Sequence, residues 1–88
     1  MQTSNFIIKN NLGLHARAAA QLVQTANKFA ADVTLLKDDV EVNGKSIMGI
    51  LLLAAPKGTE ISVTIDGPDE IAAMQALREL IEDGFGED

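Results

Sequence analysis

Apolar residues recur with two different periods along the first half of the chain. Residues 3–9 alternate between apolar and polar positions, which predicts a strand. From residue 16 to about residue 28 the apolar positions follow the period of an amphipathic helix. Alternation returns at residues 33–36 and, after a turn, at residues 40–42, so we expect two further short strands there.

The second half of the chain adds a helix, a strand and another helix. Residues 47–55 are apolar without a clear period, and they follow Ser46, which is a favourable residue for capping the start of a helix. Residues 59–66 have the clearest alternation in the chain and predict the fourth strand. We expect Pro68 at the first position of the last helix and Gly84 at its left-handed end.

The predicted order of elements is therefore β-α-β-β-α-β-α. Each strand has one apolar face, which is typical of a sheet with one face in contact with water and one face buried. The three helices are expected to cover the buried face. A length of 88 residues suits a single domain over residues 1–88, too small to enclose both a core and a deep pocket.

Composition narrows the classes of function. The chain has no cysteine and one histidine, so we expect neither a disulfide scaffold nor a metal site. The net charge is −6 with no basic patch, which argues against nucleic-acid binding. We find no signal peptide, and the longest uncharged run is too short to span a bilayer, so we expect a soluble intracellular protein without direct membrane insertion. We interpret the acidic residues 79–88 as a solvated helix end, with an interaction tail as the alternative.

The single histidine is the main candidate for chemistry. His15 lies between a loop containing glycine and the first turn of the first predicted helix. A neutral imidazole is a competent nucleophile near neutral pH, and a helix N-terminus favours an added phosphate. Arg17 adds a guanidinium whose donors match phosphate oxygens. Position alone leaves open that both are ordinary surface residues.

Two motifs carry a resemblance that favours the chemical interpretation. Gly13-Leu14-His15-Ala16-Arg17, followed by Ala19-Ala20, resembles the active-site signature of the HPr family. These proteins are the phosphocarriers of the bacterial phosphoenolpyruvate-dependent phosphotransferase systems. The block Asn43-Gly44-Lys45-Ser46-Ile47-Met48-Gly49-Ile50 is similar to the regulatory-serine region of that family. The resemblance covers about residues 5–81, and two motifs in register make it specific.

The resemblance implies a fold and a mechanism. The fold is an α+β open-faced β-sandwich, with a four-stranded antiparallel sheet covered on one face by three helices. Enzyme I would phosphorylate His15 on Nδ1, an IIA-type protein would accept the phosphoryl group, and Arg17 would steady it during transfer. The protein would then be a cytoplasmic carrier and not an independent enzyme. We expect it to need no cofactor and to be a monomer.

One position departs from the family pattern. The family usually has proline directly after the arginine, where this chain has Ala18. Proline would fix the backbone of the first helical turn, whereas alanine leaves it less pre-organised. The nucleophile and the guanidinium are unaffected, so we expect transfer to survive with an altered rate or partner preference.

Ser46 and the apolar helix after it suggest regulation and docking. Ser46 matches the serine that an HPr kinase/phosphorylase modifies in some members of the family, although an N-cap role alone would also explain it. Ile50 and Leu53 should face the sheet, which would leave other apolar residues exposed. By resemblance, a docking surface around His15 would consist of Ala16, Ala20, Gln24, Ile47, Met48 and Leu51.

Several alternatives stay open at this point. The carrier could belong to the sugar-uptake branch or to the nitrogen-related regulatory branch. A regulatory binding module, which controls a transcription factor or an enzyme through Ser46 phosphorylation, is a different class of function. The presence of His15 together with Arg17 favours the carrier. An independent enzyme is disfavoured, because the chain offers no paired acid or second base at a supportive spacing.

Overall fold

A single four-stranded antiparallel sheet forms the base of the molecule. In the computed structural model, which describes residues 1–87, the strands are β1 (Gln2–Ile7), β2 (Asp32–Lys37), β3 (Val40–Asn43) and β4 (Glu60–Asp66). Their order in the sheet is β1-β4-β2-β3, and every neighbouring pair is antiparallel. The two central strands, β4 and β2, are therefore the last and the second strands along the chain.

The alternation in β4 shows how the sequence determines the two faces of the sheet. Ile61, Val63 and Ile65 are at most 1% exposed, whereas the residues between them point to the opposite face. The opposite face is largely polar, and Thr3 of β1 meets Thr64 across the strand pair through their hydroxyl groups, 3.2 Å apart. The prediction of one buried and one wet face is confirmed.

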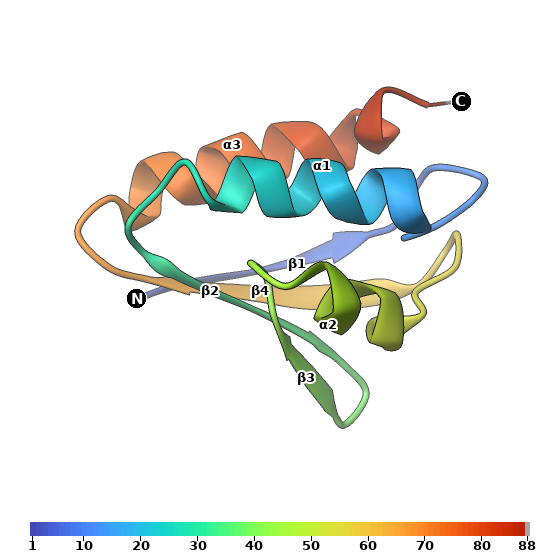
Figure 1. Cartoon of the computed structure of the whole chain (residues 1–88), viewed down its shortest axis with the longest axis horizontal. Helices are drawn as coiled ribbons and strands as arrows, with labels where there is room; N and C mark the ends of the chain where they lie inside the picture. Colours follow the sequence, from blue (N-terminus) through green and yellow to red (C-terminus); the bar gives the residue numbers. More distant parts are fainter. Residues whose placement is uncertain (88) are drawn as a thin grey trace.

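Three helices cover the apolar face of the sheet (Figure 1). They are α1 (Ala16–Ala26), α2 (Ile47–Leu53) and α3 (Glu70–Glu82), followed by the short 3-10 turn η1 (Gly84–Gly86). Figure 1 shows α1 and α3 running side by side across the sheet, with α2 beside α1, and α1 contacts both other helices. The predicted order β-α-β-β-α-β-α and the open-faced sandwich are confirmed.

The core lies between the sheet and the helices. Ile50 and Leu53 of α2 are 0% and 1% exposed, as the sequence predicted. The apolar stripe of α3 is buried at Ala73, Met74, Leu77 and Ile81. Within residues 1–87, no helix is long and apolar enough to cross a membrane.

The boundaries of two helices differ from the prediction. The first helix ends at Ala26 and not near Lys28. Pro68 is not the first residue of α3, because the helix begins at Glu70. Asp69, directly before the helix, turns its carboxylate away to accept hydrogen bonds from the backbone N–H groups of Ala30 and Ala31, at 2.8 and 2.9 Å. This contact between distant segments lowers the pKa of Asp69 and leaves the helix start without a side-chain cap.

Candidate functional site

His15 caps the N-terminus of α1. Its backbone is extended, with φ −80° and ψ −178°, and its Nδ1 accepts a hydrogen bond of 3.3 Å from the backbone N–H of Arg17. Capping of this kind satisfies one of the N–H groups that have no acceptor within the helix. The lone pair of Nδ1 therefore points at the positive end of the α1 dipole, where an anion attached to that nitrogen would be favoured.

The loop before His15 requires glycine at position 13. Gly13 has φ +67°, and a Cβ at this position would lie 2.5 Å from the carbonyl oxygen of Ala55. The next residue, Leu14, donates its backbone N–H to the same carbonyl at 2.9 Å. This close approach fixes His15 beside the segment that follows α2.

The second ring nitrogen of His15 meets a carboxylate from the other end of the chain. Nε2 lies 2.5 Å from Oε2 of Glu87, and the two side chains are 26% and 12% exposed. A carboxylate only accepts hydrogen bonds, so Nε2 carries a proton. Nδ1 accepts from Arg17, so it carries none. The arrangement fits a neutral imidazole whose proton is on Nε2 and whose unprotonated nitrogen is Nδ1.

Asn10 donates a hydrogen bond to the same carboxylate. Its side chain is 1% exposed, and its Nδ2 donates both to the carbonyl oxygen of Gly13, at 2.7 Å, and to Oε1 of Glu87, at 3.1 Å. The other amide atom, Oδ1, is buried and has no partner among the described residues. Asn10 therefore connects the loop before His15 to the C-terminal segment.

A left-handed turn after α3 brings Glu87 to this place. Gly84 and Phe85 have φ +63° and +57°, so the chain makes a tight left-handed turn directly after the helix. Phe85 is 1% exposed and anchors the turn in the core. The prediction of a left-handed residue at Gly84 is confirmed. The interpretation of residues 79–88 as a solvated helix end is wrong for Glu87, which lies beyond the helix and is largely covered.

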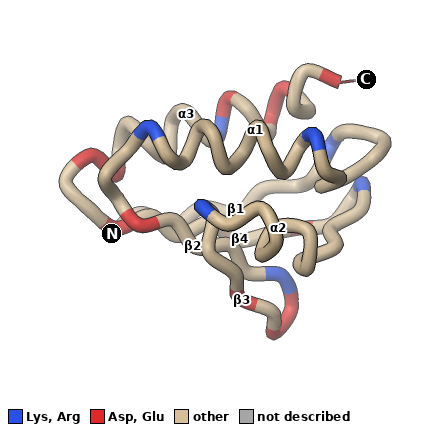
Figure 2. Tube along the Cα trace, viewed as in Figure 1, with Lys and Arg blue, Asp and Glu red and all other residues tan. Residues whose placement is uncertain are grey.

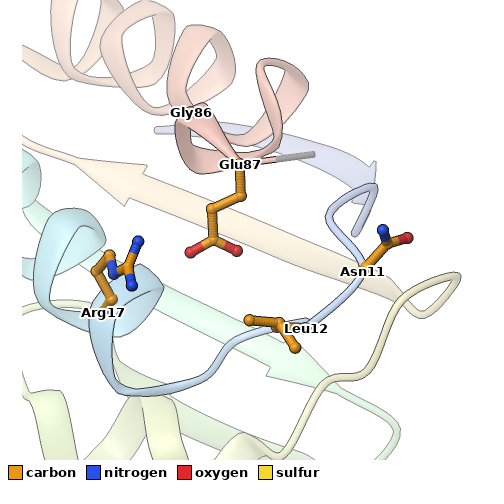
Figure 3. A pocket seen from close by; sticks show the side chains of 5 residues that line it. All are labelled: Asn11, Leu12, Arg17, Gly86 and Glu87. Carbon is orange, nitrogen blue, oxygen red and sulfur yellow. The ribbon is translucent and has the colours of Figure 1, made fainter.

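A pocket of about 450 Å³ separates Arg17 from Glu87. In Figure 3 the Glu87 carboxylate points into this pocket from above and Arg17 lies at its left, with Leu12 below and Asn11 at the right. Burial acts to raise the pKa of the Glu87 carboxyl, but hydrogen bonds from Asn10 and His15, the attraction of His15 when its ring is protonated and the charge of Arg17 lower it overall. The carboxylate is therefore ionised throughout the neutral range.

The remaining predicted residues lie on the α1–α2 side of the molecule. Ser46 is the N-cap of α2, and its hydroxyl oxygen accepts the backbone N–H of Gly49 at 3.1 Å. Met48 is 70% exposed, and Ile47 and Leu51 are exposed to a smaller extent. Of the predicted docking residues on α1, Ala16 and Gln24 are exposed and Ala20 is half-buried. The spacing of four residues places these three on one stripe of the helix.

Sequence reasoning missed four residues around this site. Leu12 and Leu52 are 69% and 73% exposed; Leu12 lines a hollow together with His15, and Leu52 adds to the exposed apolar residues of α2. Asn10 contacts the loop before His15, and Glu87 contacts the imidazole directly. The only local signal for the contact between Glu87 and the imidazole was Gly84, which indicated a left-handed turn after the helix but not the residue that the following segment would contact.

Comparisons with known proteins agree with this geometry. Residues 2–83 match the protein family described as PTS HPr component phosphorylation site. The chain is 58% identical over 88 residues to the phosphocarrier protein HPr of Xylella fastidiosa (strain 9a5c), covering 100% of this chain and 99% of that protein. It is 55% identical over 80 residues to the phosphocarrier protein HPr of Neisseria meningitidis (serogroup A, strain DSM 15465 / Z2491), covering 91% and 90%. The crystal structure of HPr from Thermoanaerobacter tengcongensis superposes with a TM-score of 0.96 at 46% identity, covering 100% and 99%.

Proposed function

The chain belongs to the HPr family, the phosphocarrier proteins of the bacterial phosphotransferase system, and from this premise we propose that it accepts a phosphoryl group from enzyme I on Nδ1 of His15 and passes it to an IIA-type acceptor. The observation that carries the proposal is the orientation of the imidazole. Nδ1 faces the N-terminus of α1, while Nε2 is held by a carboxylate.

This orientation supports both halves of the transfer. The proton of the neutral ring is on the other nitrogen, so the lone pair of Nδ1 can attack phosphorus once it gives up its 3.3 Å hydrogen bond from the N–H of Arg17. The phosphoryl oxygens would then lie near the first N–H groups of α1, which have no acceptor within the helix. Arg17, the second residue of α1, supplies a guanidinium beside the pocket that can bind the same oxygens. The group stays bound through a single P–N bond, which suits a carrier and not an independent enzyme.

The surface around His15 supports docking of partner proteins. The helix α1 has no charged residue between Arg17 and its end at Ala26, and α2 has none at all. Figure 2 shows both helices almost free of charge along their length, whereas acidic residues gather in other regions. We propose that Ala16, Ala20, Gln24, Ile47, Met48 and Leu51, together with Leu12 and Leu52, form the docking surface for enzyme I and the acceptor.

Ser46 offers a second, regulatory site on the same surface. Its hydroxyl is the N-cap of α2, so a phosphate there would meet the positive end of the helix and leave the fold intact. The added dianion would stand directly before Ile47 and Met48, where it would have to lose water when a partner docks. We propose that an HPr kinase/phosphorylase, where the source organism encodes one, modifies Ser46 and thereby slows phosphorylation of His15.

The decisive experiment is intact-mass analysis after incubation with enzyme I, magnesium and phosphoenolpyruvate. We expect the native chain to gain one phosphoryl group that is lost in acid, and His15→Ala to gain none. Ser46→Ala serves as the control, since it should gain the group like the native chain. If the native chain gains nothing from several competent enzyme I proteins, the relay is wrong, and a regulatory binding module becomes the better hypothesis.

A further inference from the structure

We propose that Glu87 is a positioning residue for phosphoryl transfer: its carboxylate keeps the proton of His15 on Nε2 and balances the positive charge that the ring gains when Nδ1 is phosphorylated. This inference rests on the proposed function, since it assigns a role within the same transfer. It concerns a residue outside both motifs of the sequence, 72 positions from the histidine.

The carboxylate is held at both oxygens. Oε2 binds Nε2 of His15 at 2.5 Å, and Oε1 accepts the amide of Asn10 at 3.1 Å. Asn10 is itself fixed, because it is 1% exposed and donates a second hydrogen bond to the carbonyl of Gly13. The buried turn at Phe85 limits movement of the backbone two residues before Glu87. A carboxylate held in this way can select one of the two tautomers of a neutral imidazole.

The transfer step accounts for the charge that Glu87 would balance. The lone pair of Nδ1 forms the new N–P bond, while the bond between phosphorus and the donor breaks and its electron pair leaves with the donor. The proton on Nε2 does not move, so the phosphorylated ring is formally cationic. A carboxylate on that N–H stabilises the cation, as the aspartate of a Ser-His-Asp triad stabilises its imidazolium. Passing the phosphoryl group onward returns the ring to the neutral Nε2–H form.

Arg17 stays available while Glu87 binds the imidazole. Within residues 1–87, the ion pairs formed do not include one between Arg17 and Glu87, although both side chains line the same pocket. The guanidinium can therefore bind the incoming phosphoryl oxygens without first leaving a carboxylate partner. Glu87 thus holds Nε2, the backbone N–H of Arg17 meets Nδ1, and the guanidinium of Arg17 stays free for the phosphoryl oxygens.

Glu87→Gln is the informative substitution, because it preserves the size of the side chain but not its selectivity for one tautomer of the imidazole. A carboxamide can accept the proton of Nε2–H or donate to an unprotonated Nε2, so it supports both tautomers. Nitrogen-15 NMR of the His15 ring, recorded on the full unphosphorylated chain at a pH where the ring is neutral, reports which nitrogen carries the proton. We expect a single Nε2–H form in the native chain and a mixture in Glu87→Gln. Glu82→Gln, an exposed acid on α3 with the same change in net charge, should retain the native spectrum.

The rate of phosphorylation by enzyme I completes the test. Losing a hydrogen bond to a charged group at a partly exposed site should slow transfer to Glu87→Gln and Glu87→Ala by about tenfold, with Glu82→Gln unchanged. A native tautomer in Glu87→Gln, or a native rate in both Glu87 variants, would overturn the role of Glu87 while His15 remained the acceptor. If the native chain gained no phosphoryl group at all, the proposed function itself would fail, which the parallel His15→Ala reaction distinguishes.

Discussion

The side-chain amide of Asn10 donates a hydrogen bond of 3.1 Å to the carboxylate of Glu87, 77 positions further along the chain. The same amide binds the carbonyl of Gly13, two residues before His15. The site is therefore assembled from the loop at residues 10–15 and from Glu87, which meet at the N-terminus of α1. This contact links the stability of the fold to the state of the site, because both depend on the ionised form of Glu87.

Acidification should release the contribution of Glu87 to stability. The pKa of Glu87 in the folded chain lies below its ordinary value of 4.5, so the folded state favours the ionised carboxyl. Its contribution to the free energy of unfolding is present above pH 4.5 and is lost as the pH falls through the lower, folded-state pKa. Urea unfolding of the native chain and Glu87→Gln should therefore differ near neutral pH and converge in acid. A gap between them that stayed constant with pH would contradict the lowered pKa.

Gly13 and Gly58 both have positive φ, but only Gly13 also lacks room for a side chain, so substitutions at the two positions separate the cost of a clash from the cost of the backbone conformation. A Cβ at Gly13 would lie 2.5 Å from a backbone oxygen, whereas a Cβ at Gly58, where φ is +90°, meets nothing within 4 Å. Gly58→Ala should cost about 1 kcal/mol for the backbone conformation alone, and Gly13→Ala about 3 kcal/mol or more because the clash is added. Urea unfolding at equilibrium measures both. Equal losses would show that the contact at Gly13 yields readily.

The elements of the fold could be predicted because each has a local cause. The alternation at residues 59–66 and the N-cap at Ser46 lie within the segments that they organise, so the sequence alone indicates the strand and the helix. Pro68 misled the prediction because Asp69, next to it, binds the backbone of residues 30 and 31, a tertiary contact with no local trace.

The same distinction between local causes and tertiary contacts applies to the site. His15 and Arg17 share one helical turn, and their roles were suggested by adjacent residues. The contact between Glu87 and His15 depends on the packing of α3 and on the buried turn at Phe85, which no local pattern encodes. An acid at the end of a chain ordinarily lies in solvent, so composition favoured the wrong interpretation of Glu87.

Replacing Ala18 by proline should stabilise the chain. Ala18 is the third residue of α1, where a backbone N–H has no acceptor within the helix, so proline removes no helical hydrogen bond. By restricting the unfolded chain, Ala18→Pro should raise the free energy of unfolding by about 0.4–1 kcal/mol. Ala18 is 0% exposed, so the proline ring must fit into the core. A loss of stability in urea would show that it does not fit, and unchanged stability together with an unchanged transfer rate would refute the pre-organisation argument.

Two substitutions at Ser46 separate its structural role from its regulatory role. Ser46→Ala removes the hydroxyl that accepts the N–H of Gly49 and should cost about 1 kcal/mol in urea unfolding. Ser46→Asp keeps a capping oxygen and should retain most of that stability. Because the carboxylate adds a charge beside the docking surface, Ser46→Asp should raise the KM for phosphorylation by enzyme I severalfold, while Ser46→Ala should leave it unchanged. A raised KM in both variants would indicate that the cap alone matters.

The docking surface can be tested with two equally exposed residues on different helices. Met48 of α2 is 70% exposed, and Ile71 of α3 is 71% exposed. At such exposure neither Met48→Glu nor Ile71→Glu should change the free energy of unfolding by more than about 0.5 kcal/mol. Met48→Glu would place a charge in the apolar centre of the proposed interface, where it must be desolvated, so KM for enzyme I should rise at least about tenfold.

Ile71→Glu provides the matched control for that experiment. It introduces the same charge at the same exposure, but on the first turn of α3, away from the α1–α2 surface. The net charge of both variants is equal, so any long-range effect of charge on the encounter with enzyme I is shared. A rise in KM confined to Met48→Glu therefore locates the partner on α2. An equal rise in both variants would attribute the effect to net charge and would remove α2 from the docking surface.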